Sequence, residues 1–333
     1  MDKTSIKLGS AKILSTGSYL PEKVRSNAEL IKVVPFDEDW IISRTGIETR
    51  RVAAENENTS DLATNAAQSA LSKSGIEVSD IDLIIVATIT PDRLLPSTAS
   101  IVREKLGANN AIAFDLNGAC SGFIFALNVA EQFIRTGAAR YVLIIIADTL
   151  TRFVTPDDPK NYILFGDGAG AALICPEEMD RGIKGILFGM DTQYPIDWLT
   201  IPLGAEFMNG RFSDDDNNSY FKMNGREIFR WAVKTVPTAI DKCLERCGNS
   251  LDDIKLIILH QANLRIISAI ADKMNLPLER FMVTIEKYGN TSAASIPIAL
   301  DEAIETGKLK PGDLFMLVGF GGGLAWGISI ITL

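Results

Sequence analysis

The first half of the chain contains the segment DIDLIIV at residues 80–86, and the second half contains DIKLIIL at residues 253–259, 173 positions later. Each copy follows a long amphipathic helical pattern, over residues 61–73 in the first half and 229–246 in the second. Helical patterns that alternate with short apolar strands are typical of a layered α/β fold. The repetition further predicts that the fold is built from two similar halves.

A second pair of helical patterns extends the repeat. One follows Cys120 and ends at Gly137, and the other follows Asn290 and ends at Gly307, so both landmarks recur after 170 positions. An apolar strand pattern and a Gly-rich turn come next in both halves. We therefore expect Cys120 and Asn290 to hold equivalent positions, and a pseudo-twofold axis to bring the two helix starts together at the centre of the molecule.

The repeat divides the chain into an N-terminal half, residues 1–178, which carries the cysteine, and a C-terminal half, residues 179–333, which carries the histidine and the asparagine. No Pro- or Ser-rich linker separates them. A chain of 333 residues with 47% hydrophobic content can bury a large core. We therefore predict two fused halves that share one core.

The composition disfavours several classes of protein. The longest purely apolar run, residues 142–147, is far shorter than the ~18 residues that a membrane helix needs, and the N-terminus does not resemble a signal peptide. Four irregularly spaced cysteines predict neither disulfides nor a structural metal. The net charge of −9 disfavours nonspecific binding to nucleic acid. We expect a cytoplasmic protein that neither enters a membrane nor needs a metal.

Three polar residues stand where strand or helix patterns begin or end. His260 is the only histidine and ends the second copy of the repeated strand, so any imidazole chemistry near neutral pH depends on it. Cys120 precedes a helical pattern whose positive end favours a thiolate, and Asn290 opens the corresponding helix. Taken singly, each is more often a structural residue. Their joint placement indicates acyl-thioester chemistry.

Two Gly-rich segments follow strand patterns. The spacing in residues 166–170 is wrong for a dinucleotide-binding loop, and a strand pattern follows where such a site requires a helix. A tight turn between core strands is the better interpretation. The glycines at 321–323 allow a close approach of the backbone, and one of their N–H groups could face the site.

Five ordered motifs resemble those of β-ketoacyl-acyl-carrier-protein synthase III. They are GACSGF (118–123), FGDGAGA (165–171), HQANLRI (260–266), YGNTSAAS (288–295) and FGGG (320–323). The resemblance extends from about Ile13 to the C-terminus and implies the thiolase fold, with duplicated βαβαβαββ halves in a five-layer αβαβα arrangement. It also implies a homodimer that starts type II fatty-acid synthesis. Such enzymes transfer an acyl group from acyl-CoA to a cysteine and join it to malonyl-acyl-carrier protein with loss of CO2, using no cofactor beyond the coenzyme A thioester substrate.

The resemblance assigns roles to the residues singled out above. Cys120 is the nucleophile, and the N–H groups of Cys120 and Gly322 form the oxyanion hole. His260 and Asn290 donate hydrogen bonds to the enolate that decarboxylation of the malonyl group creates. Residues implied to bind the coenzyme A portion, through adenine stacking, the pantetheine tunnel or its amides, are Trp40, Arg44, Thr45, Gly225, Phe229 and Asn263.

Two departures concern substrate choice. Pro159 stands where the family often has an Arg beside the adenine. Leu95 stands where the family frequently places a Phe from the partner subunit at the end of the acyl pocket, and this smaller side chain would leave room for a longer or branched primer. Because acyl-carrier proteins are acidic, docking needs a basic patch on this acidic chain. The candidates for it are Arg230, Lys234, Arg265 and Lys273.

Related condensing enzymes fit the sequence less well. Elongating enzymes use two histidines, degradative thiolases place a second cysteine near the last Gly-rich loop, and plant-type polyketide synthases carry a proline in that loop; this chain has none of these features. Two alternatives stay open. One is a thiolase-fold acyltransferase or condensing enzyme of secondary metabolism, and the other is a noncatalytic acyl-binding homologue.

Overall fold

The computed structural model describes residues 10–177, 181–201 and 220–333. Two large β-sheets form its centre. The first sheet has the strand order β1 (Ser10–Tyr19), β7 (Gly168–Glu177), β6 (Val142–Asp148), β4 (Leu83–Ala87) and β5 (Ile112–Leu116). The second has the order β8 (Gly182–Met190), β13 (Ala325–Thr332), β12 (Leu314–Gly321) and β11 (Leu256–Leu259).

The two sheets repeat one topology. The β4–β6 pair and its counterpart, the β11–β12 pair, are parallel, and the remaining pairs toward β1 and β8 are antiparallel. Strand β5 extends the first sheet in parallel with β4, whereas its counterpart is a single parallel bridge between Ile257 and Phe281. The duplicated fold predicted from the repeat is thus confirmed.

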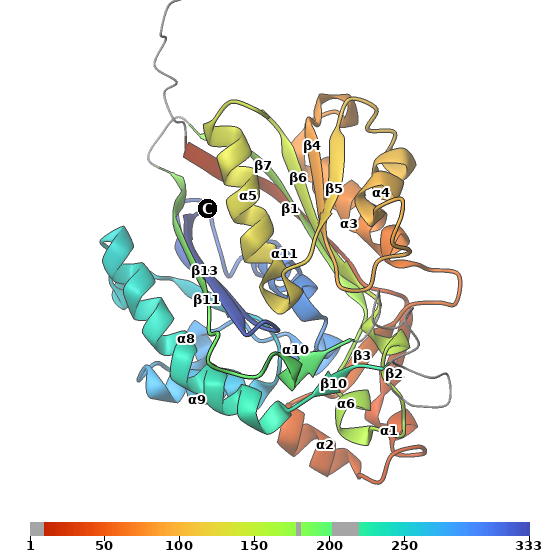
Figure 1. Cartoon of the computed structure of the whole chain (residues 1–333). Helices are drawn as coiled ribbons and strands as arrows, with labels where there is room; N and C mark the ends of the chain where they lie inside the picture. The colour runs from red at the N-terminus through yellow and green to blue at the C-terminus, as the bar shows by residue number, and fades with distance from the viewer. Residues whose placement is uncertain (1–9, 178–180, 202–219) are drawn as a thin grey trace, which may run out of the picture.

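Helices complete five layers (Figure 1). The outer face of the first sheet packs on α3 (Thr59–Ser74) and α4 (Thr98–Leu106), and the outer face of the second on α8 (Gly225–Cys247) and α9 (Leu264–Lys273). Between the sheets lie α5 (Gly122–Arg135) and α11 (Ser295–Glu305), whose side chains join both inner faces in one apolar core. A helix buried between two sheets must be apolar on most sides, which explains why residues 122–134 and 295–303 are rich in apolar residues.

Shorter elements gather at one end of the sheets, at the bottom of Figure 1. They are β2 (Lys23–Ser26), α1 (Asn27–Leu30), α2 (Glu38–Thr45), β3 (Thr49–Val52), α6 (Pro159–Tyr162), β9 (Leu199–Thr200), β10 (Lys222–Met223) and α10 (Ile285–Tyr288). Their apolar side chains form a cluster of their own that includes Phe165 and Phe221. The buried guanidinium of Arg50 connects these elements through hydrogen bonds to Asn27 Oδ1 and the Ile163 carbonyl, both 2.8 Å long.

The two halves are fused through their shared core. Strand β1 packs on β8, and α11 of the second half contacts β1 and β7 of the first. The boundary predicted at residues 178 and 179 lies between β7 and β8, outside the described residues. Among the helices that the structure describes, none has the length and apolarity needed to cross a membrane.

One detail of the predicted repeat is wrong. Short 3-10 helices precede the two central helices, at Ala119–Ser121 and Ser292–Ala294, and their starts are 173 positions apart, like those of the repeated strands. Cys120 therefore corresponds to Ala293, and Asn290 lies three residues earlier. The spacing of 170 holds only at the helix ends, because α11 has 11 residues and α5 has 14.

Candidate active site

Cys120 lies in a strained turn between β5 and α5. Ala119, just before it, has φ +43°, and the matching residue of the second half, Ser292, has φ +53°. Left-handed backbone at non-glycine residues is costly and persists where the surrounding structure imposes it. These two turns face each other at the centre of the molecule, and the Ser292 hydroxyl lies 3.7 Å from the Cys120 sulfur.

The thiol of Cys120 is buried, and burial raises its pKa from 9.0 to about 11. Hydrogen bonds from the Ser292 hydroxyl and from the N–H groups of Gly322 and Cys120 lower the pKa of this thiol in part. The desolvation of Cys120 thus opposes the start of α5, which favours a thiolate.

His260 follows β11 directly, as expected from the sequence, and is 2% exposed. Its Nδ1 atom lies 2.8 Å from the Ser295 hydroxyl, and its ring packs edge-on against Phe320. Burial lowers the pKa of His260 to about 3. The imidazole is therefore neutral at physiological pH and can serve as a hydrogen-bond donor without carrying charge.

The Gly-rich segment of the first half holds Asn290 in place. The Asn290 backbone pairs with Leu164 and Gly166 through hydrogen bonds of 2.9 and 3.1 Å. A Cβ atom at Gly166 would lie 2.2 Å from the Tyr288 carbonyl oxygen, so this close approach requires glycine. The prediction of a turn over residues 166–170 is wrong in part, because Gly168 already begins β7 and only residues 166 and 167 lie outside the strand. This short connection positions a residue of the other half.

Ser292 connects the three residues predicted to be catalytic. Its hydroxyl faces the Cys120 sulfur, its N–H donates to Asn290 Oδ1 at 2.9 Å, and its backbone carbonyl lies against the His260 ring. The hydroxyl also lies against the carboxyl group of Asp148, at the end of β6. Burial raises the pKa of Asp148 to about 6. Sequence reasoning assigned no role to Ser292 or Asp148, because neither stands out by spacing or residue type.

The last Gly-rich loop packs directly on the nucleophile. A Cβ atom at Gly321 would lie 2.7 Å from Cys120 Cβ and 2.9 Å from its sulfur. The absence of a side chain there lets the next N–H, that of Gly322, point at the sulfur beside the N–H of Cys120. The pair predicted to form an oxyanion hole is thus placed around the reactive atom.

Two cavities lie beside these residues. The first, of about 690 Å³, is bordered by Ala119, Gly322 and a mostly apolar wall that includes Phe125, Phe153 and Met190. The second, of about 970 Å³, includes Asn290 in its lining. It also contains all six residues predicted to bind the coenzyme A portion, namely Trp40, Arg44, Thr45, Gly225, Phe229 and Asn263.

Comparisons with known proteins agree with this geometry. The family models for 3-oxoacyl-[acyl-carrier-protein] synthase III and for its C-terminal part match residues 114–192 and 244–333. A β-ketoacyl-[acyl-carrier-protein] synthase III of Clostridium perfringens (strain SM101 / Type A) is 47% identical over 326 residues, which are 97% of this chain and 99% of the relative. The chain belongs to this family. The enzyme class predicted from the sequence, a synthase III, is confirmed with it.

Solved structures of the family superimpose over nearly the whole chain. The synthase III of Aquifex aeolicus VF5 has a TM-score of 0.89 and 42% sequence identity, covering 97% of this chain and 100% of that one. The priming β-ketosynthase from the R1128 polyketide biosynthetic pathway has a TM-score of 0.92 and 32% identity, covering 98% and 97%. These likenesses confirm the thiolase-type fold of a synthase III.

Several residues that the family resemblance assigned to the substrate have partners within the chain. Phe36 stacks on the Trp40 ring with the ring centroids 3.9 Å apart, and the Arg44 guanidinium carbon lies over the same ring, 5.9 Å from its centroid. The Thr45 hydroxyl bonds to Ile41 and Ile47. Asn263 caps α9 through the Arg265 N–H and donates to the Arg44 carbonyl at 3.1 Å. These bonds hold α2 and α9 together as two walls of the second cavity.

The predicted docking residues divide into two groups. Arg230 and Arg265 line the second cavity and are exposed, although Arg230 is paired with Glu227 at 2.8 Å. Lys234 and Lys273 are exposed but lie farther along α8 and α9, outside the cavity lining. The basic side chains at the cavity are therefore Arg230, Arg265 and others that the sequence prediction did not name, such as Arg226 and Lys160.

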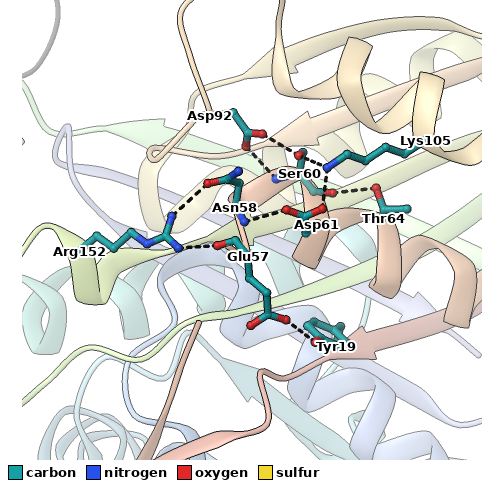
Figure 2. Close-up of polar contacts among 9 residues, drawn as sticks. All are labelled: Tyr19, Glu57, Asn58, Ser60, Asp61, Thr64, Asp92, Lys105 and Arg152. Atoms are coloured by element: carbon teal, nitrogen blue, oxygen red, sulfur yellow. Dashed lines mark hydrogen bonds and ion pairs between the residues drawn. The ribbon is translucent and has the colours of Figure 1, made fainter. Parts of the chain in front are cut away.

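Leu95 projects away from its own chain and is 86% exposed. It belongs to the loop that connects β4 to α4, and Figure 2 shows how that loop is attached. The carboxylate of Asp92 accepts hydrogen bonds from the backbone and hydroxyl of Ser60, at 2.8 and 2.6 Å, and Lys105 bonds to Ser60 and Asp61. The loop base is thus fixed to α3 while Leu95 stays uncovered.

Proposed function

We propose that this chain primes itself with an acyl group from acyl-CoA at Cys120 and condenses that group with malonyl-acyl-carrier protein, releasing CO2. The observation that supports this best is the convergence of a thiol, a neutral imidazole and a carboxamide around Ser292, between an apolar cavity and a larger cavity with basic residues. The first cavity suits an acyl chain. The second suits a pantetheine arm and its anionic nucleotide or carrier.

In the priming step, the sulfur of Cys120 attacks the thioester carbonyl. The carbonyl oxygen becomes an oxyanion that the N–H groups of Cys120 and Gly322 stabilise, and one such donor is worth roughly 3 kcal/mol. Because burial keeps Cys120 protonated in the free protein, the thiol loses its proton as the attack proceeds. The coenzyme A sulfur accepts a proton as it leaves, so the acyl-enzyme and free coenzyme A are the products.

In the condensation step, the malonyl thioester loses CO2 and its electron pair moves onto the thioester carbonyl oxygen as an enolate. His260 and Asn290 donate hydrogen bonds to that oxygen. A neutral imidazole suits this role because it stabilises the enolate without protonating its carbon. The nucleophilic carbon then attacks the acyl-cysteine carbonyl and the C–S bond breaks. The Cys120 sulfur leaves as a thiolate and takes up one proton from solvent, which regenerates the thiol.

A second copy of the chain completes the proposed enzyme. Large apolar side chains are exposed around the first cavity and the edge strand β5: Leu94, Leu95, Ile112, Phe188 and Met190. Large exposed apolar side chains and a free sheet edge favour association. Leu95 of each subunit would then close the acyl cavity of the other. The chemistry needs a reduced thiol, and all four cysteines are free, which suits a cytoplasmic enzyme.

Mass spectrometry after incubation with a panel of acyl-CoAs tests the priming step and identifies the donor. We expect the mass of one acyl group on Cys120 and none in Cys120→Ser, because a serine hydroxyl is scarcely ionised at neutral pH. His260→Ala and Asn290→Ala should retain acylation and lose decarboxylative condensation by ~10²-fold or more. Equal loss of acylation in all three variants would contradict the proposed division of roles.

An enzyme that primes secondary metabolism is the second candidate. The likeness to the priming β-ketosynthase of the R1128 polyketide pathway favours it, because that protein has the highest TM-score of the solved structures described above. Both candidates acylate Cys120 in the same way, so the acceptor distinguishes them. Condensation with the carrier protein of fatty-acid synthesis supports the first candidate, and condensation only with a dedicated carrier supports the second.

A further inference from the structure

Ser295 is the first residue of α11, and its hydroxyl lies beside His260 and Gln261, the two residues that follow β11. Its hydroxyl oxygen is 2.8 Å from His260 Nδ1 and 3.1 Å from the backbone nitrogen of Gln261. All three residues are at most 2% exposed. Buried polar hydrogens of this kind need a partner, either in the protein or in an ordered water or ligand.

The direction of these hydrogen bonds follows from counting donors and acceptors. The Gln261 N–H can only donate, so it occupies one acceptor site of the Ser295 oxygen. The hydroxyl hydrogen then needs an acceptor of its own. Within the described parts of the chain, His260 Nδ1 is the acceptor recorded at hydrogen-bonding distance from that hydroxyl. The reverse arrangement, with hydrogen on Nδ1, would leave a buried O–H without an acceptor.

We propose that Ser295 is a positioning residue that holds His260 in the tautomer with hydrogen on Nε2, so that a donor always faces the substrate. Its catalytic consequence rests on the proposed function, whereas the tautomer itself does not. Burial keeps the ring neutral, so the position of the single ring hydrogen decides whether the imidazole donates to the enolate or repels it.

Gln261 makes this arrangement rigid. Its side-chain amide donates to the carbonyls of Leu259 and Met282, at 2.7 and 3.1 Å, and its Oε1 accepts the Thr284 N–H at 2.9 Å. Because both the amide nitrogen and Oε1 of Gln261 are hydrogen-bonded, its backbone cannot turn the N–H away from Ser295. The hydroxyl of Ser295 therefore keeps only one direction in which to donate.

Because His260 is the only histidine, ¹⁵N-histidine labelling makes its ring the sole source of imidazole signals in an NMR spectrum. In the wild-type protein we expect a protonated Nε2 and an unprotonated Nδ1, unchanged between about pH 5 and about pH 9. A wild-type spectrum with hydrogen on Nδ1 would overturn the proposal. This measurement needs no substrate and no variant.

Variants then connect the tautomer to the reaction. In Ser295→Ala, we expect a shift toward the Nδ1–H tautomer and a ~10²-fold lower kcat for condensation, with acylation of Cys120 within ~3-fold of wild type. Ser295→Thr keeps the hydroxyl and should restore both the spectrum and kcat in part. Ser329→Ala removes another buried hydroxyl, which bonds to the Gly185 carbonyl in the second sheet, and should change neither.

The outcomes separate the two proposals. An unchanged tautomer in Ser295→Ala, or equal loss of acylation and condensation, overturns the positioning role. If Ser295→Ala does not fold, the wild-type spectrum and the Ser295→Thr variant still decide. A wild-type protein with the expected tautomer that fails to condense malonyl-acyl-carrier protein with its acyl group overturns the proposed function and leaves the Ser295 assignment intact.

Discussion

Replacing Gly321 by alanine tests whether the last Gly-rich loop positions the nucleophile. The added Cβ would lie 2.7 Å from Cys120 Cβ and 2.9 Å from its sulfur. Ordinary carbon contacts are no shorter than about 3.5 Å, so the loop and Cys120 must separate by ~0.8 Å. A displacement of ~1 Å in a reacting group costs ~10²-fold in rate, or ~2.7 kcal/mol of barrier.

The assay is single-turnover acylation by acyl-CoA, followed by the mass added on Cys120. The matched control is Gly137→Ala. Gly137 follows the end of α5 with φ +72°, and apart from its chain neighbours no atom of the described residues lies within 4 Å of the position a Cβ would take. That substitution costs ~1–2 kcal/mol of stability through backbone strain but moves nothing near Cys120. We expect Gly321→Ala to acylate ~10²-fold more slowly and Gly137→Ala within ~2-fold of wild type.

Urea unfolding of both variants ensures that the comparison is made on folded protein. If Gly321→Ala acylates as fast as wild type, or loses no more rate than Gly137→Ala, the close approach of the loop does not position the sulfur. The reasoning from the Gly321 contact distances would then be refuted.

Three further predictions concern charge and substrate choice. Burial raises the pKa of Cys120 to about 11, so the fraction of Cys120 present as thiolate grows with pH. The rate of its alkylation by iodoacetamide, with Cys120→Ser as the control, should therefore rise ~10-fold per pH unit from about pH 7 to about pH 10. A rate that stops rising near pH 7 would show a stabilised thiolate. Arg265→Glu should raise KM for malonyl-acyl-carrier protein ~10-fold and leave priming by acyl-CoA unchanged. Lys273→Glu, which lies outside the cavity, is the control and should change this KM less. Equal effects of Arg265→Glu on acyl-CoA and on malonyl-acyl-carrier protein would rule out a docking role. Leu95→Phe should shift kcat/KM toward acetyl-CoA over butyryl-CoA and octanoyl-CoA by ~10-fold or more, and unchanged ratios would show that Leu95 does not close the partner's cavity.

The sequence predicted the fold because its repeated apolar segments follow the periods of strands and helices, which are local properties. It also predicted where Cys120, His260 and Asn290 lie, because each stands at the end of such a segment. The predicted equivalence of Cys120 and Asn290 was wrong for a related reason. Landmarks at the helix ends agree at 170 positions, and only the structure shows that the helix starts agree at 173.

The local order of strands, helices and polar ends was thus determined by the sequence itself. The chemical state of the site was decided by the tertiary structure. Ser292 reaches Cys120 across 172 residues of chain, and no spacing rule connects two turns that meet only when the halves pack together. The same packing removes water from Cys120 and His260, and their pKa values depend on that desolvation. A side chain's protonation and partners are properties of its surroundings, and for these residues the surroundings come from both halves of the fold.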